Sequence, residues 1–371
     1  MRSRTAASHG HHFLLGLQPS PALTDHDRRL LSAVRPAGII LFKPNFREGV
    51  PYDAWLQEHA ALLREAGQCM EREKFLVCID HEGGRVIRPP RPITEFGWAS
   101  QWTDLAGPVG AAMGVELASL GVNVNFAPVV DVDTNEKNPV IADRAFSPDP
   151  EIVADAAIAF IDAMQAQGVR ACPKHFPGHG DTDADSHFAL PFVSATRHVL
   201  ARRELVPYRK IIADVGLIMS AHIVFPEIDP DRPATVSRTI MTEILRNELG
   251  FAGAVISDDI GMKGADAFFH QPDGALQAVL AGCDIVSICA AWTDTGRLTE
   301  MARNVTELAN TDGAQWALEN SRLRIEAVLQ SAPVPQVQRL PDSVFEAHRN
   351  IAPLYEPGSG RRNYSGIIAN A

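Results

Sequence analysis

The 371-residue sequence predicts an α/β protein folded as a (β/α)8 barrel, the TIM barrel, for two reasons. Short β-forming runs alternate with stretches that have helical patterns. These runs are apolar at consecutive positions, which is typical of parallel strands buried on both faces. Eight such units in one chain predict a barrel. The predicted strands are Gly38–Phe42, Phe75–Asp80, Val122–Ala127, Val169–Lys174, Leu217–His222, Ala234–Ser237, Ala254–Asp258 and Asp284–Ile288.

The elements differ in how clearly they are marked. Ala234–Ser237 is the weakest of the eight strands. The best-marked helix links the third strand to the fourth: Asp149 can cap it, Pro150 suits its first position and Gly168 ends it. The alternative fold is a doubly wound open sheet, but no Gly-x-Gly-x-x-Gly motif follows an early strand. We therefore favour the barrel.

The composition indicates a globular enzyme with a large core, because 46% of the residues are apolar and 21% are charged. We expect a single catalytic domain over residues 1–330. An extension over residues 331–371 contains five prolines and either packs on the barrel or is partly disordered. The net charge of −11 disfavours nucleic acid as a partner.

The sequence gives three indications of location. The apolar run Phe13–Leu17 is too short for the core of a signal peptide. The run Ala275–Trp292 is interrupted by Gln277 and Asp284, so we expect no membrane span. The five cysteines are an odd number, which favours free thiols in a reducing compartment over a disulfide framework. Together these features predict a cytoplasmic protein.

Polar residues gather where several predicted strands end. In a barrel the carboxyl ends of the strands converge on one face, which is where active sites of this fold lie. Any single charged strand end is equally compatible with an ordinary solvated rim, but four together indicate a site. The side chains that we expect there are Asp80, His81 and Glu82, then Lys174 and His175, then His222, and finally Asp258 and Asp259.

The most informative segment is the loop of residues 174–191, which begins Lys-His-Phe-Pro-Gly-His-Gly and continues to Asp-Ser-His at 185–187. Gly178 and Gly180 allow backbone angles that other residues resist, so we expect the loop to move. Its histidines can transfer protons near neutral pH. We interpret it as a catalytic loop.

Cleavage of a glycosidic bond needs one group that protonates the leaving oxygen and another that meets the developing oxocarbenium ion. Asp258 suits the second role, and a carboxylate near Lys174 would remain ionised. Asp259 would point elsewhere because it is the next residue on a strand. Asp185 and His187 suit the first role, with the aspartate holding the imidazole as in a serine-protease triad.

The loop resembles the signature of family 3 glycoside hydrolases of the bacterial β-N-acetylglucosaminidase type. The resemblance covers about residues 12–290, and Ala142 and Ala145 stand where the family has Gly and Ser. Three further segments support it: Ile79–Val86 with Arg88 behind it, Ile141–Phe146, and Ile256–Met262.

The resemblance implies a retaining, exo-acting β-N-acetylhexosaminidase that acts on muropeptide fragments of the cell wall and needs no cofactor or metal. It implies that His187 is the acid/base, Asp185 its partner and Asp258 the nucleophile. The implied contacts to the sugar come from Asp80, Arg88, Arg144, Lys174 and His175.

Three other functions stay open. A metal-dependent hydrolase would take ligands from His175, His179, Asp181, Asp183, Asp185 and His187, although a glycine-rich loop holds ligands poorly. A non-catalytic sugar-binding barrel would not need Asp258 or the Asp-Ser-His segment. The third function is a phosphorylase, which is also an enzyme that cleaves glycosides. A histidine acid/base adds no second anion to the site, so phosphate could replace water as the acceptor of the sugar.

Overall fold

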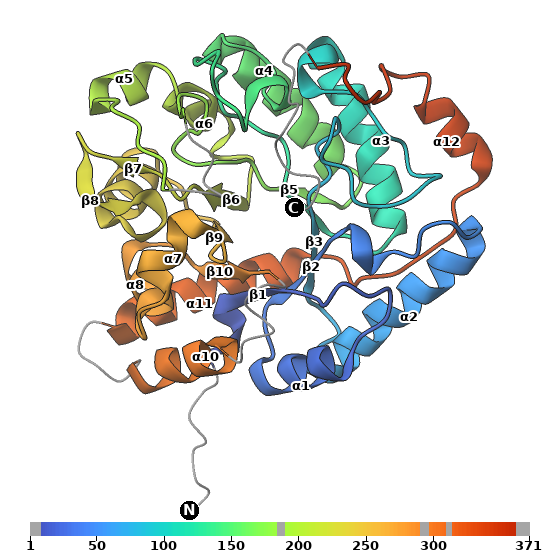
Figure 1. Cartoon of the computed structure of the whole chain (residues 1–371), viewed down its shortest axis with the longest axis horizontal. Helices are drawn as coiled ribbons and strands as arrows, with labels where there is room; N and C mark the ends of the chain where they lie inside the picture. The colour runs from blue at the N-terminus through green and yellow to red at the C-terminus, as the bar shows by residue number, and fades with distance from the viewer. Residues whose placement is uncertain (1–8, 184–189, 290–296, 309–313, 361–371) are drawn as a thin grey trace, which may run out of the picture.

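Eight parallel strands form the centre of the molecule, and helices surround them (Figure 1). The computed structural model describes residues 9–183, 190–289, 297–308 and 314–360. Neighbouring strands follow one another in the chain, and the last strand, β10, pairs with β1. Hydrogen bonds between Phe176 and both Met219 and Ala221 join the segment after β5 to β6 and close the ring. The strands are β1 (Phe13–Gly16), β2 (Gly38–Leu41), β3 (Leu76–Ile79), β4 (Val124–Asn125), β5 (Arg170–Ala171), β6 (Leu217–Ser220), β9 (Ala254–Asp259) and β10 (Ile285–Ile288).

This arrangement is the predicted TIM barrel, but one of the eight predicted strands is wrong. Ala234–Ser237 is not a strand: Ala234–Val236 forms a short 3-10 turn, in which the Thr235 hydroxyl bonds to the Ala221 carbonyl. The eighth strand is instead β1, whose residues are all buried and which pairs with both β2 and β10. On the sequence alone, this apolar run is rejected as the core of a signal peptide and is not predicted as a strand.

Helices alternate with the strands along the chain, as the sequence predicts. The predicted helix is α4 (Pro150–Gln165), and the Asp149 side chain caps it by accepting from the Glu151 N–H at 2.9 Å. Between β6 and β9 lie the short hairpin β7 (Val224–Phe225) and β8 (Asp229–Pro233) and a helix of π type, Thr239–Glu248. The other helices are α1 (Asp25–Val34), α2 (Tyr52–Met70), α3 (Ala106–Ser119), α5 (Arg197–Arg202), α6 (Leu205–Ile211), α7 (Lys263–Phe269), α8 (Gly274–Ala281), α10 (Arg297–Leu308), α11 (Ala314–Ser331) and α12 (Asp342–His348).

The strands are buried on both faces, as parallel barrel strands must be. Alternate residues such as Leu14, Ile40 and Cys78 fill the barrel interior, while their neighbours pack against the helices. Ile325 and Val328 of α11 join the interior cluster and cover the amino ends of the strands. The carboxyl ends are therefore left to form the site.

Residues after α11 pack along the outside of the barrel. Gln338 donates its backbone N–H to the Ser119 carbonyl at 2.8 Å, and Phe345 is fully buried. The His348 ring lies 2.7 Å from a Glu116 carboxylate oxygen. All five cysteines are free. Among the described residues, no helix is both long and apolar enough to cross a membrane.

Candidate active site

The carboxyl ends of five strands carry the polar groups that the sequence places there. Asp80 and Glu82 follow β3, Lys174 and His175 follow β5, and Asp258 lies near the end of β9. β4 and β6 contribute as well, through the segments that follow them. Because these strands are parallel and adjacent around the ring, the side chains share one face of the barrel.

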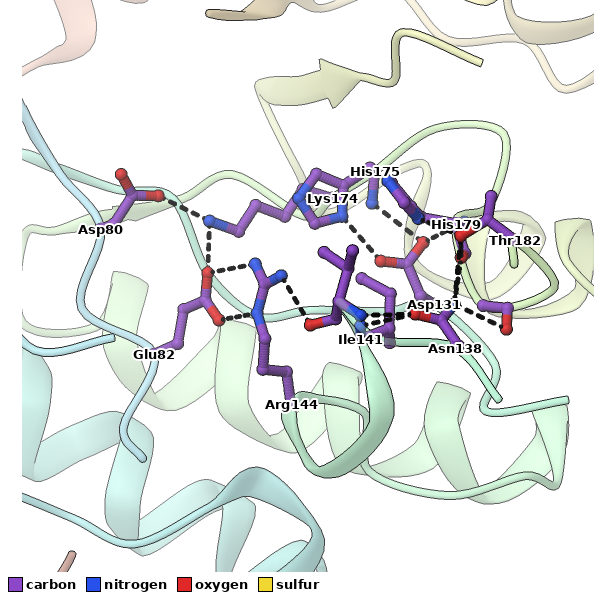
Figure 2. A network of polar contacts seen from close by, with 12 residues as sticks. Asp80, Glu82, Asp131, Asn138, Ile141, Arg144, Lys174, His175, His179 and Thr182 are labelled. Carbon is purple, nitrogen blue, oxygen red and sulfur yellow. Dashed lines mark hydrogen bonds and ion pairs between the residues drawn. The ribbon is translucent and has the colours of Figure 1, made fainter. Parts of the chain in front are cut away.

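Lys174 is the centre of an ion network that joins two strand ends (Figure 2). Its Nζ lies 2.6 Å from Asp80 Oδ1 and 2.5 Å from Glu82 Oε1. Arg144 holds Glu82 from the other side with two parallel bonds, from Nε at 2.8 Å and from a terminal nitrogen at 2.9 Å. Such bidentate pairs fix both charge and geometry.

The network keeps buried charges ionised. Burial alone would raise the pKa of Glu82, but Arg144 and Lys174 outweigh burial and hold that pKa well below its ordinary value. Burial would likewise lower the pKa of Lys174, yet Asp80 and Glu82 raise it. The ammonium therefore stays charged with little access to water.

Asp80 is the more accessible of the two carboxylates that bind Lys174. Its side chain is 16% exposed, compared with 4% for Glu82. Arg88 is similarly accessible and has a terminal nitrogen 3.9 Å from Asp80 Oδ2. Asp80 and Arg88 can thus meet a ligand directly, whereas Glu82 and Arg144 are positioned to support them through Lys174.

A second network orients His175 from the segment after β4. The Asp131 carboxylate lies 2.7 Å from His175 Nδ1, and it also accepts the backbone N–H groups of His175 and His179 at 3.2 and 2.7 Å. An ionised carboxylate only accepts, so His175 Nδ1 carries the proton and Nε2 is left for a ligand. Burial would raise the pKa of Asp131, but His175 and His179 outweigh it and lower that pKa.

We expect Asp131→Ala to destabilise the protein by about 3 kcal/mol, because it leaves buried N–H groups without an acceptor. Asp131→Asn retains an acceptor and should cost less. Since the folded-state pKa of Asp131 is lowered, its stabilisation is present above pH ~4 and is lost as the pH falls further. Urea unfolding from pH 7 to pH 3 should therefore measure a higher free energy of unfolding for the native protein than for Asp131→Asn at neutral pH. This difference should become smaller below pH ~4. An advantage that is constant across this range would contradict the role given to the Asp131 charge.

The first part of the candidate catalytic loop makes several contacts with the rest of the barrel. Asn138 donates to the carbonyls of His179 and Gly180 at 2.8 and 3.0 Å, and Asp181 pairs with Arg203 at 2.7 Å. A Cβ on Gly180 would lie 1.7 Å from the Val132 carbonyl oxygen, so this glycine permits close packing. At Gly180 the glycine therefore serves a tight fit, and the expected mobility of the loop stays a prediction.

Asp258 and Asp259 differ as the strand geometry predicts. Asp259 Oδ1 accepts the backbone N–H groups of Gly261 and Cys289, both at 3.0 Å, and burial raises its pKa. His222 Nε2 lies 3.1 Å from the backbone carbonyl oxygen of Asp258. Asp259 thus ties β9 to β10. His222, with a pKa lowered by burial, supports the backbone of Asp258.

Six of the eight predicted site residues lie within the described structure. Ion pairs join Asp80, Arg88, Arg144 and Lys174 into one cluster, Arg144 acting through Glu82. His175 and Asp258 lie on the same face of the barrel. Asp185 and His187 lie outside the described residues, so their placement stays a prediction.

Sequence reasoning missed Asp131. Asp131 stands in the run Val130-Asp131-Val132, shortly after the third predicted strand. The rule that selected Asp80 and Asp258, polar residues behind an apolar strand, would have selected it too. Asn138 carries no such signal, because it lies in a long loop.

The loop side chains proposed as metal ligands are engaged elsewhere. His175 Nδ1 is bound to Asp131, His179 Nδ1 lies 2.9 Å from the Thr182 hydroxyl, and Asp181 pairs with Arg203. These bonds anchor the described part of the loop, and they occupy Asp181, but they leave Nε2 of both histidines available, so the metal-dependent hydrolase stays an alternative to be tested.

A barrel with carboxylates, imidazoles and cations at the carboxyl ends of its strands has the equipment of a carbohydrate-cleaving enzyme. Residues 17–328 match the family model described as "Glycosyl hydrolase family 3 N terminal domain". The chain therefore belongs to glycosyl hydrolase family 3, and it is a glycoside hydrolase.

Individual relatives agree with this assignment. The chain is 36% identical over 276 residues to a beta-hexosaminidase of Idiomarina loihiensis, covering 72% of this chain and 80% of the relative. It is 34% identical over 345 residues to beta-hexosaminidase A of Pseudoalteromonas piscicida, covering 87% of this chain but only 56% of that longer protein.

Two solved structures are also similar. A family 3 beta-N-acetylglucosaminidase from Paenibacillus sp. has a TM-score of 0.82 and 31% identity, over 94% of this chain and 68% of that one. NagZ from Neisseria gonorrhoeae, solved in complex with N-trifluoroacetyl-D-glucosamine, has a TM-score of 0.68 and 29% identity, over 84% of this chain and 98% of that one.

Proposed function

We propose that this enzyme is a retaining, exo-acting β-N-acetylglucosaminidase that removes terminal β-linked N-acetylhexosamine residues. Asp258 attacks the anomeric carbon, and His187, oriented by Asp185, protonates the leaving oxygen. His187 then deprotonates the water that releases the sugar from Asp258. The observation that carries this proposal is the position of Asp258 at the end of β9, on the rim that also holds the Lys174 network.

The ion-paired cluster around Lys174 is suited to binding the hydroxyl groups of a sugar. Asp80 is partly accessible, and its carboxylate can accept hydroxyl protons beside Lys174. Lys174 has three N–H donors and uses two on Asp80 and Glu82, which leaves one for the sugar. Arg88 and His175 Nε2 complete the set. Arg144 has a second role, because its bonds to Glu82 also support Lys174, and its guanidinium keeps N–H donors for the proposed contact with the sugar.

The two carboxylates that bind Lys174 should therefore respond differently to removal of their charge. Asp80→Asn should lower kcat/KM by about 100-fold, because it loses a charge-assisted bond to the sugar. It should also cost some stability, because it removes one countercharge from Lys174, but less than the change at Glu82, which is more buried and also pairs with Arg144. Glu82→Gln should instead destabilise the fold by about 3 kcal/mol, because it leaves Arg144 and Lys174 buried with one countercharge fewer. Urea unfolding and steady-state kinetics on both variants would separate these effects. The reverse pattern would place Glu82, rather than Asp80, against the substrate.

The physiological substrate that we propose is a muropeptide fragment of the cell wall, cleaved in the cytoplasm. The names of the relatives support an N-acetylhexosamine substrate. Five free cysteines suit a reducing compartment. Release of N-acetylglucosamine from purified muropeptides would support this assignment, whereas cleavage restricted to other glycans would contradict it.

A panel of nitrophenyl β-glycosides tests the proposed reaction. The N-acetylglucosaminide should be cleaved much faster than the glucoside, and the product should be the free sugar with or without added phosphate. A sugar phosphate formed at an increased rate in phosphate would identify a phosphorylase instead.

The same substrate tests the need for a metal. Extended treatment with EDTA should leave the rate at 25 °C unchanged, because side chains supply every proposed catalytic group. A loss of activity that zinc restores would favour the metal-dependent hydrolase. Binding without turnover of any glycoside would indicate a non-catalytic sugar-binding barrel.

A further inference from the structure

Three histidines cluster at the amino end of the barrel, opposite the catalytic face. His9, His11 and His12 lie on or beside the short 3-10 turn Gly10–His12, which leads directly into β1. One ring nitrogen from each lies within 4.8 Å of the other two. His9 Nδ1, His11 Nε2 and His12 Nε2 are buried and have no hydrogen-bond partner among the described residues.

His12 is held in the tautomer that a metal ligand needs. Its side chain is almost fully buried, and its Nδ1 lies 3.0 Å from the Asp284 carbonyl oxygen. A carbonyl only accepts, so Nδ1 carries the proton and Nε2 presents a lone pair. Metal-binding histidines usually donate their second ring N–H to such an acceptor, which fixes the ring.

Two ion pairs hold Asp284, the residue whose carbonyl oxygen contacts His12. Arg246 and Arg324 bind opposite oxygens of the Asp284 carboxylate at 2.7 and 2.8 Å. Asp284 lies next to β10, and Arg324 belongs to α11, which packs against β9 and the turn Gly10–His12. The carbonyl that orients His12 is thus fixed by two elements of the barrel.

Gly10 brings the three rings together. A Cβ at this position would lie 1.6 Å from the Val34 carbonyl oxygen at the end of α1, so only glycine allows the turn to pack there. The resulting ring centroids are 4.3 Å apart for His11 and His12, and 5.9 Å apart for His9 and His11.

The surroundings of the three imidazoles favour the neutral form, which is the form that binds a metal. Burial, with repulsion from the neighbouring rings, lowers the pKa of His11 to about 2, and burial lowers the pKa of His12 to about 4. Arg72 and Arg322 add positive charge near His11, but Arg322 is paired with Glu319 and Glu326. Buried lone pairs without donors are costly, so a cation between them would satisfy all three.

We propose that His9, His11 and His12 form a binding site for a divalent transition metal, with zinc as the preferred ion. Three imidazole nitrogens, with a fourth position left for water, are a known zinc ligand set. At Zn–N distances of about 2.1 Å, tetrahedral ligand atoms lie ~3.4 Å apart. His9 and His11 are only partly buried, which leaves their rings room to turn inward. The ion would fasten the turn before β1 to the barrel, away from the catalytic face.

Zinc titration of metal-free full-length protein, followed by calorimetry, tests the site. The native protein should bind one more equivalent of zinc than His11→Gln, with a dissociation constant in the micromolar range or tighter. Any residual binding at this position in the variant should be at least about 100-fold weaker. Zinc should also raise the Tm of the native protein by more than that of the variant.

His9→Gln provides a second test, because His9 is partly exposed and its replacement should leave folding intact. His198→Gln is the matched control: His198 is exposed on α5, and this variant should bind zinc like the native protein. Equal zinc stoichiometry and affinity in the native protein, His9→Gln and His11→Gln would overturn the proposal. The measurement is independent of glycosidase activity.

Discussion

Asp258→Ala is expected to lower kcat by at least about 10,000-fold, because it removes the carboxylate that we propose as the nucleophile. The fold should survive the change. The side chain lies on the polar face of the barrel, only partly buried, so its removal opens no cavity in the core. Steady-state kinetics with a nitrophenyl N-acetylglucosaminide would measure the loss, and circular dichroism would verify the fold.

The neighbouring aspartate is the matched control. Asp259→Asn should retain most of the activity, because an amide oxygen can still accept the N–H groups of Gly261 and Cys289. Alanine is a poorer control at this position, since it would leave both N–H groups without an acceptor. An inactive Asp259→Asn together with an active Asp258→Ala would show that the nucleophile had been assigned to the wrong residue.

His187→Ala should lose far more activity on a disaccharide than on a nitrophenyl glycoside. A general acid contributes about 100- to 10,000-fold, and it matters most when the leaving group is a poor one such as a sugar alkoxide. A nitrophenolate leaves with little protonation. The ratio of kcat/KM values for the two substrates, compared between variant and native enzyme, measures this difference.

The second half of the reaction gives an independent readout of His187. Hydrolysis of the glycosyl-enzyme needs a base, so the variant should show a burst of nitrophenol followed by slow turnover. Azide needs no base and should restore turnover with the activated substrate. Asp185→Ala should show a milder form of the same behaviour, because it only orients and polarises the imidazole. Equal losses on both substrates without azide rescue would assign His187 to binding instead.

The barrel and the positions of Asp80, Lys174 and Asp258 were predictable for one physical reason. Parallel strands must be buried on both faces, so the sequence marks them as apolar runs, and the polar residue behind each run must lie on the shared rim. This argument needs no knowledge of side-chain contacts. It failed at Ala234–Ser237, where Ala234–Val236 forms a 3-10 turn although Thr235 and Val236 are β-forming residues. It also failed at β1, whose short apolar run is similar to part of a leader segment.

The contacts within the site were not predictable in the same way. Asp131 and His175 are 44 residues apart, and no periodicity connects them. Glu82 belongs to a recognised motif, yet only its bonds to Arg144 and Lys174 show that it neutralises both. Such pairings depend on side-chain positions that the fold sets and the sequence pattern does not encode. The Gly180 contact with Val132 is a further example, because a glycine chosen for close packing has the same signature as one chosen for flexibility.

The most direct test of the proposed mechanism is to trap the covalent intermediate. A 5-fluoro glycosyl fluoride of N-acetylglucosamine should form a slowly hydrolysed adduct, which mass spectrometry of a proteolytic digest can locate. We expect one added sugar on the peptide that contains Asp258, and fragmentation should place it on Asp258 rather than Asp259. A sugar attached to a different residue, or complete turnover of the reagent with inversion at the anomeric carbon and no adduct, would contradict the account.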